Sequence, residues 1–460
     1  MNKNRLSLAV AGCLLALAPG LAMADDLAEL KAELAAQRAL VAAQQARLEA
    51  LEKRLEAAAA TANKPAPAAA AVSNAAPVGA AASGWPAGMT FYGTADAGVE
   101  YGNYGKGYVS RVQSGIGQVS HLGLKAERKL GDDMIGYFRL EAGISLDNGQ
   151  NTLHPTTISG AAPGAMASAS NNTTGVAIFS RGSYVGLRGR VGDLRFGRDY
   201  TSAYLLTAPS DPMAVGGATA FRLWGALAVT RFDNGVYYET PNFGGLQGHL
   251  SYSAGMENNS TADVGVSGGL SPTRVGNNDQ LGPKDEGRGS SGKLSYTTDR
   301  LFVGAGYISY FKQGNVTAPA SEPSHRLSKN LAASYDLDWI KLYGHYISGS
   351  DSQVGAAANP SMKADVWWLG LTVPFNKVHL LRAVYGRLDD KLATNRDSIH
   401  KGLGYEYLLD AQTKVYAFYA TVSNQNGGTN SLCIGGSCQG FSVAPDVSPK
   451  SLMFGTQYRF

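Results

Sequence analysis

The sequence has few cysteines, few charges and no long apolar run beyond its first residues, and each absence excludes a class of protein. The 460 residues include 3 cysteines, and charged residues make up 17% of the chain, with a formal net charge of +4. So mild a charge gives no basis for binding nucleic acid or an acidic membrane surface. Outside the N-terminus, no segment approaches the ~20 apolar residues of a membrane-spanning helix. A position within a membrane would therefore require a β-barrel.

The sequence also lacks the motifs of enzymes, metal sites and cofactor sites. A hydrolase built on a barrel needs a serine or aspartate paired with histidine at the rim. The histidines follow neither a nucleophile-elbow nor a metal-ligand spacing: His121, His154, His249, His325, His345, His379 and His400. Glycine clusters such as GLRGR lie in predicted wall and turn segments and not in phosphate-binding loops. We therefore predict no catalytic residue, no metal site and no cofactor.

The first 24 residues have the organisation of a secretory signal peptide. Lys3 and Arg5 form its positive region, and residues 6–21 form its apolar region. Ala22-Met23-Ala24 supplies a cleavage site of the A-x-A type. A lipoprotein signal at Cys13 is the alternative, but few apolar residues precede this cysteine and the apolar run continues beyond it.

Export and cleavage leave two cysteines, Cys433 and Cys438, in the segment CIGGSC. In an oxidising compartment such a pair predicts a disulfide that closes a small loop. A metal-binding pair is the alternative, and it has no histidine or second cysteine pair nearby.

Residues 25–60 carry an unbroken heptad pattern. The positions that share one helical stripe are separated alternately by three and four residues: Leu27, Leu30, Leu34, Gln37, Val41, Gln44, Leu48, Leu51, Leu55 and Ala58. This pattern predicts a coiled coil that self-associates, with the two glutamines as polar layers in its seam. A single helix packed on its own domain is the alternative. Residues 61–88, rich in alanine and proline, are predicted to be an extended linker.

Residues 89–460 alternate between short strand-like segments, tight turns and long polar loops. The tight connections, rich in Gly, Asp, Asn or Pro, lie at 131–133, 191–193, 241–246, 297–300, 336–338, 374–377 and 410–413. The longer loops lie at 101–117, 147–175, 201–230, 256–290, 313–324, 348–362, 389–398 and 423–449. Short turns at one end and long loops at the other are typical of outer-membrane barrels. The count predicts an all-β transmembrane barrel of 16 antiparallel strands, with both of its ends on the turn side.

Several segments of the predicted barrel resemble a known family. They are FYGTADAGVEY (91–101), SHLGLKAERKLGDDMIGYFRLEAG (120–143), SRGSYVGLRGRVGDLRFGRDY (180–200), NGVYYETPNFGGLQGHLSYS (234–253) and SLMFGTQYRF (451–460). In this order they resemble the trimeric general porins of Gram-negative bacteria, in particular those of the neisserial and betaproteobacterial type. The resemblance implies a homotrimer of sixteen-stranded barrels, with the third external loop folded into each lumen. The N-terminal coiled coil is not part of the common pattern and looks like a periplasmic extension.

The resemblance also implies partners in the outer membrane. In this family a terminal phenylalanine, here Phe460, belongs to a signal that the barrel-assembly machinery reads. Lipid and lipopolysaccharide are expected around the barrel. On the last strand, Leu452, Phe454 and Tyr458 share one parity with Phe460 and are predicted to face lipid.

A pore needs a width and an electric field and no catalytic group. By strand parity, the residues predicted to face the lumen are His121, Lys125, Arg139, Glu141, Arg181 and Arg231, and those predicted to face lipid are Leu122, Leu124, Phe138, Leu140 and Tyr184. The resemblance implies a ladder of basic residues on adjacent strands, which we call the basic ladder: His121, Arg139, Arg181 and Arg231. His121 departs from the arginine usual in the family, and histidine titrates near neutral pH.

The loop 201–230 is predicted to form the constriction, and it carries few charges. Asp211 is its one acid and Arg222 its one base. We expect Asp211 to oppose the basic ladder, with Asp96 as a second acid and Glu141 as a partner of the arginines. Because the acidic side is so sparse, the constriction should lean positive and prefer anions modestly.

The sequence as a whole predicts an outer-membrane porin that passes small hydrophilic solutes and ions by diffusion, with a periplasmic N-terminal extension. One alternative is a substrate-preferring channel for organic acids or phosphate-like anions. A second is an envelope tether or adhesin whose coiled coil binds peptidoglycan or a periplasmic partner.

Overall fold

The computed structural model describes residues 88–149, 178–256, 288–311, 324–353, 362–432 and 443–460. All of them belong to the compact unit Pro77–Phe460. The predicted signal peptide, coiled coil and nearly all of the linker lie outside the described residues, as do Cys433 and Cys438, so these remain predictions. Within the described ranges, no helix is both long and apolar enough to cross a membrane.

Most of the described chain is β-strand. The strands are β1 (Met89–Asn103), β2 (Tyr108–Ser114), β3 (His121–Lys129), β4 (Met134–Gly143), β5 (Gly182–Gly189), β6 (Gly192–Tyr200), β7 (Arg231–Glu239), β8 (Leu246–Ser253), β9 (Gly289–Thr297), β10 (Leu301–Phe311), β11 (Ser324–Asp336), β12 (Lys341–Gln353), β13 (Lys363–Phe375), β14 (His379–Asp390), β15 (Ser398–Leu408), β16 (Thr413–Asn424) and β17 (Lys450–Arg459). Between β6 and β7 lie three short helices, η2 (Tyr204–Leu206), η3 (Ala208–Ser210) and α3 (Phe221–Trp224).

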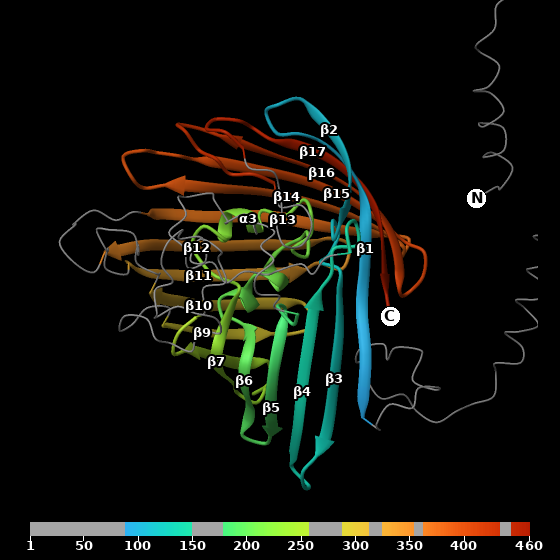
Figure 1. The fold of residues 1–460 in the computed structure, drawn as a ribbon, viewed down its shortest axis with the longest axis vertical. Coiled ribbons are helices and arrows are strands. Elements are labelled where there is room, and N and C mark those ends of the chain that lie inside the picture. The colour runs from blue at the N-terminus through green and yellow to red at the C-terminus, as the bar shows by residue number, and fades with distance from the viewer. Residues whose placement is uncertain (1–87, 150–177, 257–287, 312–323, 354–361, 433–442) are drawn as a thin grey trace, which may run out of the picture. The chain divides into compact units, whose positions relative to one another are not determined.

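The strands close into one antiparallel barrel (Figure 1). From β3 to β17 each strand pairs with the next, and β17 returns to β1 in a continuous register from Thr94↔Arg459 to Asn103↔Lys450. Closure leaves no free sheet edge, which is the condition for a sheet to span a membrane.

One wall position is shared by two strands. β1 pairs with β3 through residues 89–94 and with β2 through residues 97–103, so β2 and β3 follow one another along the same edge of β1. The seventeen strands therefore occupy the sixteen positions predicted from the sequence. The expected loop 101–117 was wrong in part, because Tyr108–Ser114 is a strand that turns back on β1.

Asp96 binds the irregular segment between β2 and β3. Its buried carboxylate accepts hydrogen bonds from the backbone N–H groups of Gly117 (3.0 Å) and Gln118 (3.1 Å) and from the hydroxyl of Tyr416 (2.6 Å). These bonds tie the irregular segment to β1 and β16. Asp96 is thus enclosed by the wall and does not face the open lumen as an acidic counterweight, contrary to expectation.

All seven predicted tight connections join neighbouring strands, and they lie at the same end of the barrel, which we call the turn end. The β5–β6 turn shows why glycine is required there. Gly192 has φ of 124°, and a Cβ at this position would overlap the carbonyl oxygen of Glu239. The opposite end is called the loop end.

Alternation along each strand separates an apolar outer face from a polar inner face. In β17, Leu452, Phe454 and Tyr458 are exposed on the outside while Met453 and Gln457 are buried inside, which confirms the predicted parity.

Tyr184 was assigned to the lipid side in error. It is the cross-strand partner of Arg139, so it shares the inner face, and Val185 takes the outer one. Arg181 precedes the first residue of β5, so strand parity does not govern its side chain.

Candidate functional site in the barrel lumen

Residues 201–230, called loop 3 here, run inside the barrel. Figure 1 shows this segment in green within the ring of strands, with α3 beside β13, which it contacts together with β14. Most residues of loop 3 are buried. The loop contacts the wall along its whole course. At its start Ser202 forms hydrogen bonds with Ser251 and Ser291, and near its end the carbonyl of Leu227 accepts a hydrogen bond from Ser328. The predicted constriction loop is therefore in the lumen.

Wall glycines let loop 3 lie directly against the strands. A Cβ at Gly402 would overlap the carbonyl of Ala218, and a Cβ at Gly370 would overlap the ring of Pro212. A Cβ at Gly386 would lie 2.8 Å from that of Ala220. Because glycine has no side chain, the loop backbone approaches the wall backbone at these points.

Asp211 stabilises residues 211–219, which we call the tip of loop 3. Its carboxylate accepts hydrogen bonds from the backbone N–H groups of Met213 (3.0 Å) and Val215 (2.8 Å) and from the hydroxyl of Thr219 (2.5 Å). These bonds enclose Ala214 and Val215, whose φ values of 52° and 59° are unfavourable for residues with a Cβ. Burial raises the pKa of Asp211, while the three hydrogen bonds oppose that rise.

Asp211 therefore lies inside the loop, at 3% exposure, and does not present its carboxylate to the lumen as expected from the sequence. Arg222 in α3 is buried as well, and burial lowers its pKa to about 10. It therefore stays protonated at neutral pH. The water-facing residues of loop 3 are instead apolar, with Ala208 and Ala214 exposed.

The basic ladder gathers around Glu141. Arg181 donates from Nε to Oε1 of Glu141 (2.7 Å), and Arg139 forms an ion pair with its Oε2. Tyr92 donates its hydroxyl to Oε2 (2.8 Å) and accepts from Nε of Arg139 (2.7 Å). One carboxylate thus serves two guanidinium groups.

Arg231 joins this group without an acidic partner. Its Nε donates to the carbonyl of Arg181 (2.7 Å), and its guanidinium lies 4.1 Å from the ring centre of Tyr200, a cation–π contact. Among the described residues, no carboxylate lies within ion-pair distance of Arg231. His121 completes the ladder, donating from Nδ1 to the carbonyl of Val119 (2.8 Å).

The arginines of the basic ladder differ in their exposure to water. The side chain of Arg139 is 33% exposed, against 9% for that of Arg181, and Arg231 as a residue is 3% exposed. Lys125 is exposed, and its Nζ lies 5.6 Å from the ring centre of Tyr92, the same distance as Cζ of Arg139. Solutes would thus contact Arg139 and Lys125 directly. The charges of Arg181 and Arg231 would act on them without direct contact.

Several lumen charges were not among the predicted site residues. Arg195 of β6 contacts Asp199 (2.9 Å), and Arg382 of β14 contacts Glu406 (3.1 Å), which also binds Lys414 (2.9 Å). Strand parity places both arginines on the inner face, because each has an exposed apolar neighbour on its strand, Phe196 and Leu381 respectively.

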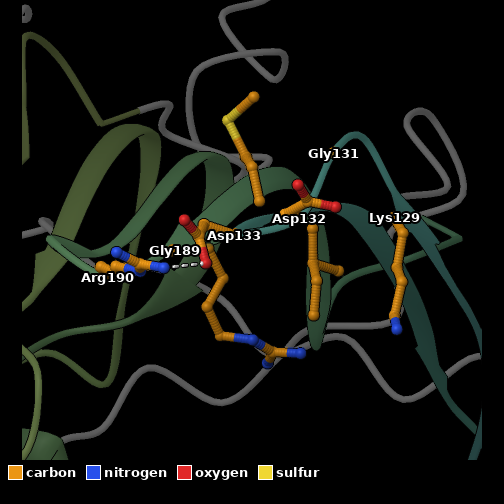
Figure 2. Close-up of a pocket in the computed structure, with 9 residues that line it drawn as sticks. Lys129, Gly131, Asp132, Asp133, Gly189 and Arg190 are labelled. Carbon is orange, nitrogen blue, oxygen red and sulfur yellow. Dashed lines mark ion pairs between the residues drawn. The ribbon is translucent and has the colours of Figure 1, made fainter.

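A shallow pocket of about 370 Å³ lies at the turn end, away from loop 3. Figure 2 shows Arg190 and Asp133 pointing toward one another across it, at 2.7 Å. Its charged groups are exposed and largely paired, so it is not a candidate site. No group of three or more potential metal ligands occurs in the described part of the chain.

Known proteins share this sequence pattern and fold. A family model described as Gram-negative porin matches residues 57–427. An outer membrane porin protein of Bordetella pertussis is 25% identical over 354 residues, covering 72% of this chain and 82% of that protein. Outer membrane porin protein 32 of Delftia acidovorans is 26% identical over 358 residues, covering 75% and 86%.

Solved structures agree on the fold. An anion-selective porin from Comamonas acidovorans superposes with a TM-score of 0.63 at 23% identity, covering 81% of this chain and 99% of that one. The trimer form of OmpT from Vibrio cholerae has a TM-score of 0.55 at 14% identity, covering 81% and 99%.

Proposed function

Since this chain belongs to the Gram-negative porin family and is an outer-membrane channel, we propose that its lumen passes small hydrophilic solutes by diffusion with a preference for anions. The observation that carries the preference is the charge of the basic ladder. Arg139, Arg181 and Arg231 supply three positive charges, and Glu141 supplies one negative charge. In a narrow lumen with low-dielectric walls such an excess acts strongly on passing ions.

Loop 3 does not cancel this excess. Its one acid, Asp211, is matched by its one base, Arg222, so the loop adds no net charge. The anion selectivity of the Comamonas acidovorans porin, which shares the fold, is consistent with the proposal.

The reversal potential of the purified channel in a planar bilayer tests the proposal. Across a gradient of potassium chloride, we expect a potential whose sign shows chloride to be the more permeant ion. A potential near zero, or of the opposite sign, would contradict the assignment of the ladder.

A second candidate is a channel that prefers organic acids. The exposed residues of loop 3 include Ala208 and Ala214, while Arg139 and Lys125 reach water on the wall. An apolar surface combined with cations suits a carboxylate with an apolar body better than inorganic phosphate. This candidate would be supported if an aromatic carboxylate blocked the chloride current and a phosphate ion of the same net charge did not.

The barrel is proposed to form a homotrimer through β3–β6. Exposed tyrosine or tryptophan occurs on β1, β2 and most strands from β7 to β17, but on none of β3–β6. Such aromatic residues mark contact with the membrane interface. The outer face of β3–β6 carries Val185, Leu187 and Phe196 instead, which suits contact with another subunit. The trimer form of OmpT, with a similar fold, supports this assembly.

Val185→Glu is expected to abolish the trimer, because it would bury a carboxylate between apolar subunit faces. Leu403→Glu on β15 is the matched control, since Leu403 is exposed to a similar degree on a strand with exposed tyrosine. Mass determination in detergent should give monomers for the first variant and trimers for the second. Trimers in both would place the interface elsewhere. The remaining expected partners, which are lipopolysaccharide, the barrel-assembly machinery and a periplasmic partner of the N-terminal extension, stay predictions.

A further inference from the structure

Three histidines of the barrel wall contact loop 3 at successive points along its course. They come from three different strands: His249 from β8, His345 from β12 and His400 from β15. All three are buried on the inner face. Their contacts, each 2.8 Å long, are Nδ1 of His249 with Oγ of Ser202, Nδ1 of His345 with Oγ of Ser210, and Nε2 of His400 with the carbonyl of Ala218.

We propose that His249, His345 and His400 are positioning residues that hold loop 3 against the wall and thereby determine the bore of the channel. The proposal rests on the channel function and is independent of the anion preference. The histidines do not contact the solute; they act through the loop whose position limits it.

His249 links the ladder side of the wall to the start of loop 3. Nη2 of Arg195 lies 2.9 Å from Nε2 of His249, and because a guanidinium can only donate, Nε2 must accept. The proton of this neutral ring is therefore on Nδ1, which donates to Ser202. The hydroxyl of Ser202 in turn donates to the carbonyl of Ser291 on β9 (3.0 Å). This directional chain of hydrogen bonds fixes the start of loop 3 against β8 and β9.

His345 holds the middle of loop 3 together with Trp368. The two rings are stacked with centres 4.2 Å apart, and Nε1 of Trp368 donates to the carbonyl of Ser210 (2.8 Å). On its other side, Nε2 of His345 bonds to Oδ1 of Asn330 (3.2 Å), which also accepts from Nε1 of Trp224 in α3 (3.0 Å). His345 and Asn330 thus join the segment of loop 3 around Ser210 to the segment around Trp224.

His400 holds the end of the tip of loop 3. Its Nε2–H donates to the carbonyl of Ala218, directly above Gly402. Gly402 has no side chain that could donate to the carbonyl of Ala218. The imidazole therefore supplies the polar contact at a place where the two backbones touch.

Replacement of all three histidines by alanine tests the proposal. Loop 3 should then make excursions into the bore, so we expect frequent brief closures and a mean single-channel conductance lower by roughly a third, because conductance follows pore width. His379→Ala is the control, since His379 lies on β14 at the turn end, stacked with Phe375 and Tyr405 and without contact to loop 3. Wild-type conductance and wild-type closing in a folded triple variant would overturn the proposal.

A covalent tether separates positioning from any other role of the rings. In the triple variant, Ala220→Cys and Gly386→Cys place two thiols next to one another. Their Cβ atoms would lie 2.8 Å apart in the wild-type geometry, so this part of loop 3 must move about 1 Å from the wall to reach the roughly 3.5–4.5 Å that a disulfide needs. Cys433→Ser and Cys438→Ser leave this as the one pair. Oxidation should suppress the brief closures and restore most of the wild-type conductance, and reduction should remove the effect. Failure of the oxidised tether to restore conductance would show that the histidines do not act through the loop.

A single conservative change keeps the test open if the triple variant does not fold. The amide of a glutamine can donate to the carbonyl of Ala218, so His400→Gln should close as rarely as the wild type, while His400→Ala should close more often. Equal behaviour of these two variants would count against the proposal. The reversal potential should stay unchanged in all of them, so a failure here is distinct from a failure of the anion preference.

Discussion

Replacing Arg181 and Arg231 by glutamine is expected to shift the reversal potential strongly toward cations. The double variant removes two of three positive charges and leaves Arg139 opposite Glu141, so the ladder becomes neutral. At about 8 Å and an effective dielectric constant of about 20, each charge acts on an ion with about 2 kcal/mol before screening by salt. After screening, we expect the anion-to-cation permeability ratio to fall about fivefold, or about 1 kcal/mol.

The variant should still fold, because Glu141 keeps Arg139 and Tyr92 as partners. Arg300→Gln is the matched control, since Arg300 lies in an exposed turn and pairs with Asp338. It removes one charge far from loop 3 and should leave the reversal potential unchanged. A double variant that retains wild-type selectivity would show that the missed charges, such as Arg195 and Arg382, set the preference instead.

Asp211→Ala is expected to destabilise the tip of loop 3 and to make the channel current unsteady. The substitution removes an acceptor of three hydrogen bonds, a loss of about 3 kcal/mol after the relief of backbone strain. Without these bonds, Ala214 and Val215 should leave their left-handed conformations. Noise in the single-channel current measures the result.

Two companion variants separate the fold of the tip from its charge. Ala214→Gly relieves the strain but keeps all three bonds, so it should conduct as the wild type does. Asp211→Asn keeps an acceptor oxygen and removes the charge. If Asp211 were an acid facing the lumen, Asp211→Asn would raise the anion preference by the effect of a full charge. We expect a clearly smaller shift, together with some of the noise of Asp211→Ala.

The wall of the barrel was largely predictable. The seven turns, the sixteen wall positions and the outward parity of β17 all follow from local rules, because a strand alternates its faces every second residue. The two wrong predictions concern positions where strand alternation and strand length are not reliable guides. β2 was missed because its segment is short and lies between glycines, and Tyr184 was misplaced because parity was counted from Arg181, which precedes the strand.

The lumen was predictable only in its composition. The sequence alone shows that loop 3 has one acid and one base, and that arginines alternate with apolar residues on the neighbouring strands. It does not show that Asp211 accepts hydrogen bonds from its own loop. Nor does it show that Glu141 forms ion pairs with two arginines, while Arg231 has no carboxylate partner among the described residues.

What the sequence by itself determined is the closed sheet, its turns and which face of most strands meets lipid, since each depends on residues close together in the chain. What only the tertiary structure decided is the use of the inner side chains. Ala218 and His400 lie 182 residues apart, and Ser210 and His345 lie 135 apart, so nothing local relates them. The physical reason is that barrel closure and the path of loop 3 bring these groups together, and that path depends on contacts with many strands at once.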